Sequence, residues 1–126
     1  MSEFKKNNTF VKRRDEANRI LDKYPDRIPI IIENYPDCDT LEKLEKNKYL
    51  VPKNIIMSQL IKIVKKRGQI SPQKGIFCFI DSVIPSQNDT VEQLYDKYKE
   101  SCGFLYITIR SENVFGFFNI KETKYI

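Results

Sequence analysis

The chain has 126 residues and a formal net charge of +5, and 40% of its residues are hydrophobic while 31% are charged. This length fits one domain, and this balance is typical of a globular protein and too apolar for a disordered one. The longest apolar runs, such as Ile28 to Ile32, are far shorter than the roughly 20 residues of a membrane-spanning helix, and the first residues lack the apolar core of a signal peptide. The sequence contains no histidine, which excludes His-based triads, His-ligated metal sites and His general-base catalysis within the chain.

The first element with a clear helical pattern is predicted over Phe10–Tyr24; Thr9 can cap this helix and Pro25 ends it. Its apolar residues recur at helical spacing, whereas a shorter helix over Ser2–Lys6 has a weaker pattern. A strand is predicted over Arg27–Tyr35, with apolar residues on both of its faces. Because a strand buried on both sides needs two covers, we expect the long helix to cover the second face.

Strands and helices alternate in the middle of the chain. Lys48–Pro52 is predicted to be a short strand at a sheet edge, because Pro52 cannot donate to a ladder. An amphipathic helix begins near Ile56 and ends at Gly68, with its lysines turned outward. Ile76–Ile80 is the third predicted strand.

The last predicted elements are a short helix capped by Asp89 or Thr90 and a strand over Phe104–Arg110. The resulting order is helical extension, strand, strand, helix, strand, short helix, strand. This is the order of the ubiquitin-like β-grasp, an α+β fold with a four-stranded mixed sheet and a packed helix. Its first and last strands pair in parallel through the long crossover that such pairs require.

The three cysteines, Cys38, Cys78 and Cys102, form no Cys-x-x-Cys pair, which excludes a zinc ribbon and a thioredoxin motif. An odd, sparse set of cysteines fits a reducing compartment. Cys78 lies within an apolar strand and is interpreted as a small core residue. No candidate base accompanies any of the three, so the chain is predicted not to be an enzyme and to need no metal or other cofactor.

The positive charge is concentrated in one part of the chain. Residues 41–67 hold eight basic and two acidic side chains, a net charge of +6. Such a segment can attract an acidic peptide, an anionic lipid surface or a nucleic acid, or it can be a solvated face that protects an edge strand from aggregation. Only Tyr49 interleaves these lysines as a stacking aromatic, so nucleic acid is not expected as a partner.

Seven short motifs carry a family resemblance that runs from about Phe4 to Gly116. They are Lys12-Arg13-Arg14, Tyr24-Pro25-Asp26-Arg27-Ile28-Pro29, Lys46-Asn47-Lys48-Tyr49-Leu50-Val51-Pro52, Phe77-Cys78-Phe79, Val83-Ile84-Pro85, Phe104-Leu105-Tyr106 and Val114-Phe115-Gly116. In this order and spacing they make the chain resemble the ubiquitin-like autophagy modifiers of the GABARAP and microtubule-light-chain type. The resemblance divides the chain into a helical extension (1–26), a β-grasp core ending in a reactive glycine (27–116) and a C-terminal propeptide (117–126).

The resemblance implies a precursor that a cysteine protease cuts between Gly116 and Phe117, with Phe115 preceding the cut. Activating and conjugating enzymes would then carry the glycine carboxylate as a thioester and transfer it to phosphatidylethanolamine, which becomes a covalent modification. Glycine suits this chemistry because it threads a narrow channel and leaves an unhindered carbonyl. The implied location is the cytoplasm before conjugation and autophagosomal membranes after it. A bulky Phe117-Phe118 pair follows the glycine, so the efficiency of the cut is left open.

The resemblance also implies capture of receptors that carry an aromatic-x-x-aliphatic motif, by strand addition to the second strand. The residues matched to an aromatic pocket are Glu16, Ile20, Pro29, Ile31, Lys48, Leu50 and Phe104. Those matched to an aliphatic pocket are Tyr49, Val51, Pro52, Ile55, Leu60 and Ile63. Those matched to a basic rim that faces an acidic peptide flank are Arg27, Lys46, Lys48 and Arg67.

Phe77 and Phe79 alternate outward from Cys78 and are a possible second surface for processing enzymes or partners, with a covered structural role as the alternative. Microtubules are a further candidate partner of the family type. Two other functions stay open from the residues alone. One is a non-conjugated β-grasp adaptor that binds acidic peptides, cytoskeleton or nucleic acid through residues 41–67, and the other is a modifier conjugated to protein.

Overall fold

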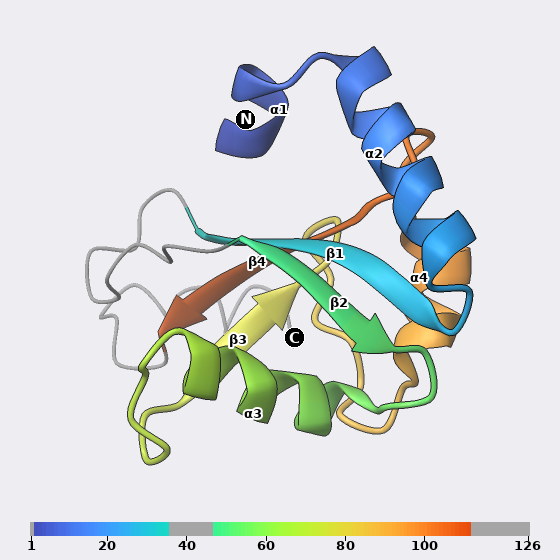
Figure 1. The fold of residues 1–126 in the computed structure, drawn as a ribbon. Helices are drawn as coiled ribbons and strands as arrows, with labels where there is room; N and C mark the ends of the chain where they lie inside the picture. Colours follow the sequence, from blue (N-terminus) through green and yellow to red (C-terminus); the bar gives the residue numbers. More distant parts are fainter. Residues whose placement is uncertain (1, 36–46, 112–126) are drawn as a thin grey trace.

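The computed structural model describes residues 2–35 and 47–111. Its elements are α1 (Glu3–Asn7), α2 (Phe10–Lys23), β1 (Arg27–Asn34), β2 (Lys48–Pro52), α3 (Met57–Arg67), β3 (Ile76–Phe79), α4 (Val91–Tyr98) and β4 (Leu105–Ser111). This order confirms the predicted β-grasp with its helical extension. Figure 1 shows one sheet with α3 on one face and α1 and α2 on the other.

The four strands form a mixed sheet in the order β2-β1-β4-β3. β1 and β4 are parallel, and β2 and β3 pair antiparallel with β1 and β4. The parallel pairing of the first and last strands is therefore confirmed. Pro29 is accommodated because the β1–β4 register begins only at Ile30, so no ladder bond is lost where the proline lacks its N–H.

The main core lies between the sheet and α3. Ile28, Ile30 and Ile32 of β1 point into it, as the alternation predicted, and meet Leu60 and Val64 of α3. Leu105, Ile107 and Ile109 of β4 and Cys78 of β3 complete the same layer. Cys78 is 3% exposed, which confirms its interpretation as a core residue.

A smaller apolar cluster fills the other face of the sheet. α2 covers this face as predicted, but it contributes only Ala17 as a fully buried side chain. Phe4 of α1 is the larger of the two buried side chains that the N-terminal helices contribute, and it packs edge-on against Phe104, with 5.4 Å between ring centroids. Gly103 permits the close approach of α2, because its φ is +104° and a Cβ there would meet the Ala17 Cβ at 2.9 Å.

The predicted helix ends are largely confirmed. The Thr9 hydroxyl accepts from the Lys12 N–H at 3.2 Å, and Thr90, not Asp89, caps α4 in a reciprocal box with Gln93. Gly68 ends α3 as predicted, although its φ of −84° is one that any residue adopts. The left-handed residue is Gln69, with a φ of 55°, so the chain reverses one residue later than the glycine indicates.

Candidate functional site

The outer edge of β2 presents backbone groups that no strand among the described residues pairs. The Ile32 N–H donates to the Asn47 carbonyl at 2.8 Å. In the antiparallel register the backbone N–H and C=O groups of Tyr49 and Val51 therefore point toward β1. By alternation, the backbone N–H and C=O groups of Lys48 and Leu50 point away from β1, toward the open edge of the sheet. β2 is the first strand in the sheet order, so it is an edge able to accept another strand. The Leu50 carbonyl already accepts from the Arg27 guanidinium at 3.4 Å, and an added strand would replace that contact.

The two faces of β2 lead to different helices. Side chains of Lys48 and Leu50 lie on the face covered by α2, whereas Tyr49 and Val51 point into the core under α3. Residues three apart in an added strand point to opposite faces of the sheet. An aromatic-x-x-aliphatic segment on this edge would therefore place one anchor toward α2 and the other toward α3. This is the division between the two residue sets matched from the sequence, except for Pro52, which was matched to the aliphatic pocket but by alternation shares the face of Lys48 and Leu50.

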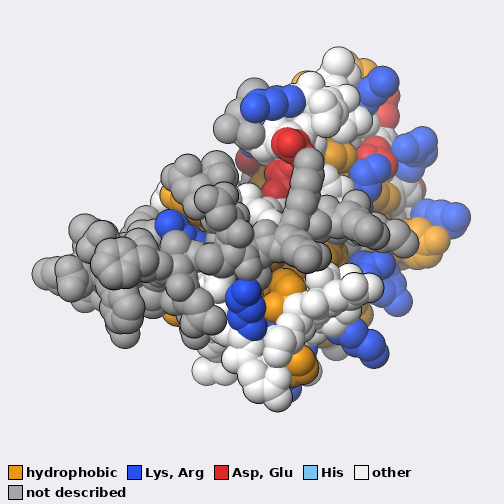
Figure 2. Space-filling model, turned by 90° about the vertical axis from the view of Figure 1, so that its left-hand side faces the viewer, with side chains coloured by type: hydrophobic (Ala, Val, Ile, Leu, Met, Phe, Trp, Pro, Cys, Tyr) orange, Lys and Arg blue, Asp and Glu red, His pale blue; other side chains and the backbone are white. Residues whose placement is uncertain are grey.

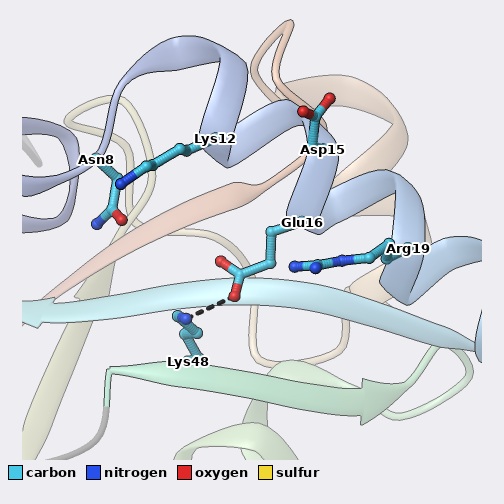
Figure 3. A pocket seen from close by; sticks show the side chains of 6 residues that line it. All are labelled: Asn8, Lys12, Asp15, Glu16, Arg19 and Lys48. Carbon is cyan, nitrogen blue, oxygen red and sulfur yellow. Dashed lines mark hydrogen bonds and ion pairs between the residues drawn. The ribbon is translucent and has the colours of Figure 1, made fainter.

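On the α2 face, a polar hollow of about 330 Å³ lies between the helix and the start of β2. Its lining residues are Asn8, Lys12, Asp15, Glu16, Arg19 and Lys48. Figure 3 shows Glu16 reaching down from α2 to Lys48, with 2.6 Å between the Glu16 carboxylate and the Lys48 ammonium, while Asp15 points away from the strand. Glu16 and Lys48 were anticipated, and the other four residues were missed because their neighbourhood depends on the angle at which α2 crosses the sheet.

The apolar residues matched to the aromatic pocket lie on the same face of the sheet but do not line this hollow. Ile31 and Phe104 are 0% and 1% exposed, and Pro29 is also buried, whereas Ile20 and Leu50 are partly exposed. The deepest members are therefore closed off, and Phe104 and Ile31 share their buried cluster with Phe4. Access for an aromatic side chain would be over Ile20 and Leu50. The signal for Phe4 in the sequence was weak: it is the only large apolar residue between Ser2 and Thr9.

Three polar contacts hold α1 over the sheet. The Ser2 hydroxyl donates to one carboxylate oxygen of Glu33, and the Phe4 N–H donates to the other at 3.1 Å. The Lys5 ammonium lies 2.7 Å from the Glu100 carboxylate and 4.3 Å from the centroid of the Tyr106 ring. These contacts join α1 to β1, to the α4–β4 turn and to β4, so the extension is part of the folded unit.

On the α3 face, the residues matched to the aliphatic pocket divide into a floor and a rim. Tyr49, Val51 and Leu60 are 1%, 2% and 0% exposed and belong to the main core. They offer a ligand almost no surface, because α3 packs directly onto β2 here. Pro52, Ile55 and Ile63 are partly exposed, so an aliphatic side chain could contact these three.

Basic side chains border both faces. Arg67 at the end of α3 stacks on Tyr49, with 4.9 Å from the guanidinium carbon to the ring centroid, and Arg27 and Lys48 are exposed. Figure 2 shows Lys and Arg side chains along the right-hand margin of one side of the molecule, with apolar side chains between them. Lys46, the fourth predicted member of the rim, lies outside the described residues.

The buried polar groups show no catalytic arrangement among the described residues. The Tyr106 hydroxyl accepts from the Arg13 guanidinium at 3.2 Å and lies 3.5 Å from the Cys102 sulfur. Burial raises the pKa of Tyr106, and burial alone raises the pKa of the Cys78 thiol to about 12, so both stay protonated at neutral pH. Within residues 2–35 and 47–111, no cluster of metal-ligating side chains and no helix suited to crossing a bilayer is found.

The prediction of an exposed Phe77–Phe79 surface is wrong for Phe79. That side chain is 4% exposed, and its ring lies 5.8 Å from the ring of Tyr35, which follows β1. Tyr35 in turn stacks on Arg110, so these two side chains cover the sheet beside Phe79. Phe77 is partly buried. The covered structural role, which the sequence left open, therefore holds for Phe79. The predicted processing residues Phe115, Gly116 and Phe117 lie outside the described part of the chain.

Comparison with known proteins places this geometry in a family. The model of the family "Autophagy protein Atg8 ubiquitin like" matches residues 12–116. The chain is 43% identical over 115 residues to "Autophagy-related protein 8" of Schizosaccharomyces pombe, covering 91% of this chain and 94% of the yeast protein. It is 42% identical over 113 residues to "Autophagy-related protein 8e" of Arabidopsis thaliana, covering 90% and 92% of the two chains.

A solved structure agrees with the sequence comparisons. The crystal structure of Trypanosoma brucei ATG8 superposes with a TM-score of 0.87 and 30% sequence identity, covering 92% of this chain and 99% of that one. The family consists of ubiquitin-like modifiers and adaptors that act in autophagy, not of enzymes. This chain is a member of the Atg8 ubiquitin-like family.

Proposed function

We propose that this autophagy-related chain is a precursor that a cysteine protease cuts after Gly116, and that enzymes then join the new carboxylate to phosphatidylethanolamine. The observation that carries the proposal is that the family match ends at Gly116, ten residues before the end of the 126-residue sequence. The match therefore separates the part of the chain that the family shares, which ends at Gly116, from residues 117–126, which the family model does not include. The free protein would be cytoplasmic and the conjugate would sit on autophagosomal membranes.

The chemistry needs an accessible acyl end. Activation by ATP first converts the Gly116 carboxylate to an acyl-adenylate; a thiolate attacks its carbonyl and expels AMP to form a thioester. The headgroup amine then attacks the thioester, expels the thiolate and loses a proton to leave an amide. Five residues separate the end of β4 at Ser111 from Gly116, a reach of at most about 18 Å beyond the sheet. A two-chain lipid supplies about 0.8 kcal/mol per buried CH₂, which makes anchoring durable where one chain binds reversibly.

The second part of the proposal is receptor capture on the edge of β2. An added strand would bond to the outward backbone groups of Lys48 and Leu50, while its aromatic and aliphatic side chains contact the α2 and α3 faces. The exposed cations Arg27, Lys48 and Arg67 would attract an acidic flank. The Lys48–Glu16 ion pair is part of this surface, because an acidic residue of the ligand would compete with Glu16 for Lys48.

The conjugation proposal is tested by intact mass. Incubation of the full chain with a cognate protease should remove ten residues, and Gly116→Ala should block both the cut and lipidation in cells. Gly75→Ala serves as control, because Gly75 is a loop glycine outside the left-handed region. An unchanged mass of the unsubstituted chain would refute the proposal and favour the non-conjugated adaptor.

The groove is tested by calorimetry with an acidic Trp-x-x-Leu peptide. Lys48→Glu combined with Leu50→Ala should abolish binding while the unfolding transition stays cooperative, because both residues lie on the solvent edge of β2. Lys97→Glu makes the same charge change on the exposed surface of α4 and should bind normally. Equal affinity of the two variants for the peptide would remove β2 as the site.

A further inference from the structure

The propeptide contains the very spacing that the edge of β2 can accept. An aromatic residue followed three positions later by Ile, Leu or Val occurs four times in the sequence, at Phe77–Ile80, Phe104–Ile107, Tyr106–Ile109 and Phe117–Ile120. In the first three pairs the aliphatic member is 1%, 1% and 0% exposed, because each pair lies in or beside a strand of the sheet. The fourth pair comes after Ser111, the last residue that the structure describes, and within the segment that the proposed cut after Gly116 would release.

We propose that residues 117–120 of one precursor occupy the β2 groove of a second copy, so that the cut after Gly116 also removes a competitor for receptor peptides. This inference rests on the peptide groove proposed above. Phe117 would lie toward α2 over the partly exposed Ile20 and Leu50, and Ile120 toward α3 over Ile55 and Ile63. The odd spacing matters, since residues two or four apart would both point to one face.

The direction of the chain fits this occupant. β4 runs antiparallel to β2, so its end at Ser111 lies at the same end of the sheet as Lys48, where β2 begins (Figure 1). A segment that approaches from this end can run alongside β2 toward Pro52. Within one chain this course would require the segment to reverse after β4, because β2 runs opposite to β4, whereas a segment from a second copy needs no such turn.

Distance favours a second copy over the chain's own groove. The registers align Lys48 with Ile31 and Ile31 with Tyr106, five residues before Ser111. Five residues along a strand and three strand spacings across it put the groove beside Lys48 about 22 Å from Ser111. The six residues from Ser111 to Phe117 reach at most about 20–22 Å when fully extended. A single chain would have no slack for the turn onto the edge, whereas a neighbouring copy has no such limit.

The test is sedimentation of the full chain over a range of concentrations, with variants that separate motif from composition. The unsubstituted precursor should self-associate, and Phe117→Ala or Ile120→Ala should weaken the association at least about 30-fold. The exchange variant Phe117→Asn with Asn119→Phe keeps the composition but destroys the aromatic-x-x-aliphatic spacing. It should weaken self-association as much as Phe117→Ala does. Phe118→Ala removes a neighbouring aromatic side chain, keeps the spacing and should associate as the unsubstituted chain does.

Calorimetry with the acidic Trp-x-x-Leu peptide separates this inference from the proposed function. At chain concentrations where the precursor associates, the peptide should bind the Phe117→Ala chain more tightly than the unsubstituted chain. Peptide binding that is equal in both, with a monomeric precursor, would overturn the inference and leave the groove intact. Peptide binding to neither chain would overturn the groove itself. A precursor that is monomeric at every concentration, yet binds the peptide more weakly than Phe117→Ala, would place the motif in its own groove and overturn the assignment to a second copy.

Discussion

Phe4→Ala should release α1 from the sheet while the rest of the fold stays intact. Burial of the Phe4 side chain, which is 4% exposed, contributes roughly 1.5–3 kcal/mol, and its edge-on contact with Phe104 adds about 0.5–1.5 kcal/mol. A docking free energy near 3 kcal/mol keeps the detached state below about 1% of molecules. The partly exposed Lys5–Glu100 ion pair contributes at most about 1 kcal/mol, and a five-residue helix has no stability of its own. The hydrogen bonds to Glu33 remain possible in the variant, but they do not offset the cost of ordering the backbone of α1, about 1–2 kcal/mol per residue.

The two buried cysteines make this opening measurable. Cys102, 2% exposed, shares the small apolar cluster with Phe4, whereas Cys78 lies in the main core on the other face. In a Cys38→Ser background, Phe4→Ala should raise the rate of thiol labelling at Cys102 about 100-fold and leave Cys78 protected. Phe10→Ala removes an exposed phenylalanine and is the matched control.

Two results would refute this reasoning. Labelling of Cys102 that stays as slow as in the unsubstituted chain would mean that Ala17 and α2 alone seal the cluster. Equal acceleration at Cys102 and Cys78 would mean that the whole domain had unfolded, so that α1 is not a separable cover.

Four further substitutions probe single features of the fold. Gly103→Ala should lower the free energy of unfolding by at least about 2 kcal/mol in urea denaturation, because it combines a φ of +104° with a Cβ contact of 2.9 Å to Ala17. Leu60→Ala should lower the free energy of unfolding by about 2–5 kcal/mol and Leu50→Ala by less than about 1 kcal/mol, because only Leu60 is fully buried in the core. Equal losses of unfolding free energy would contradict the separation of the buried pocket floor from the strand edge. The Cys78 thiol has a pKa raised from 9.0 to about 12 in the folded state, so the folded chain binds more protons than the unfolded chain between these values and stability should fall as pH rises through them. Melting temperatures measured from neutral pH upward should therefore fall less steeply for Cys78→Ala than for the unsubstituted chain, and parallel curves would contradict this account.

The order and faces of the elements could be predicted because they follow from local patterns. The alternation in Arg27–Asn34 defines two apolar faces, and the proline at the end of Lys48–Pro52 indicates an edge strand. Side-chain direction in a strand has a period of two whatever the rest of the chain does. Both the β2 edge and its two faces were therefore available from the sequence.

Exposure within the candidate site could not be predicted in this way. Leu60 and Ile63 lie three residues apart on one amphipathic helix, yet only Leu60 is closed off, because that difference depends on the angle at which α3 meets the sheet. Phe79 alternates outward from its strand as predicted but is buried under Tyr35, which lies 44 positions earlier.

By itself, then, the amino-acid order determined the succession of helices and strands, the edge position of β2 and the glycine that closes the family module. Only the tertiary structure decided that Phe4 covers Phe104, that Glu16 engages Lys48 and that Tyr49, Val51 and Leu60 lie beneath the surface. The physical reason is that strand and helix periodicity is set by each residue's own backbone, whereas burial is set by segments that meet across the fold after being far apart along the chain.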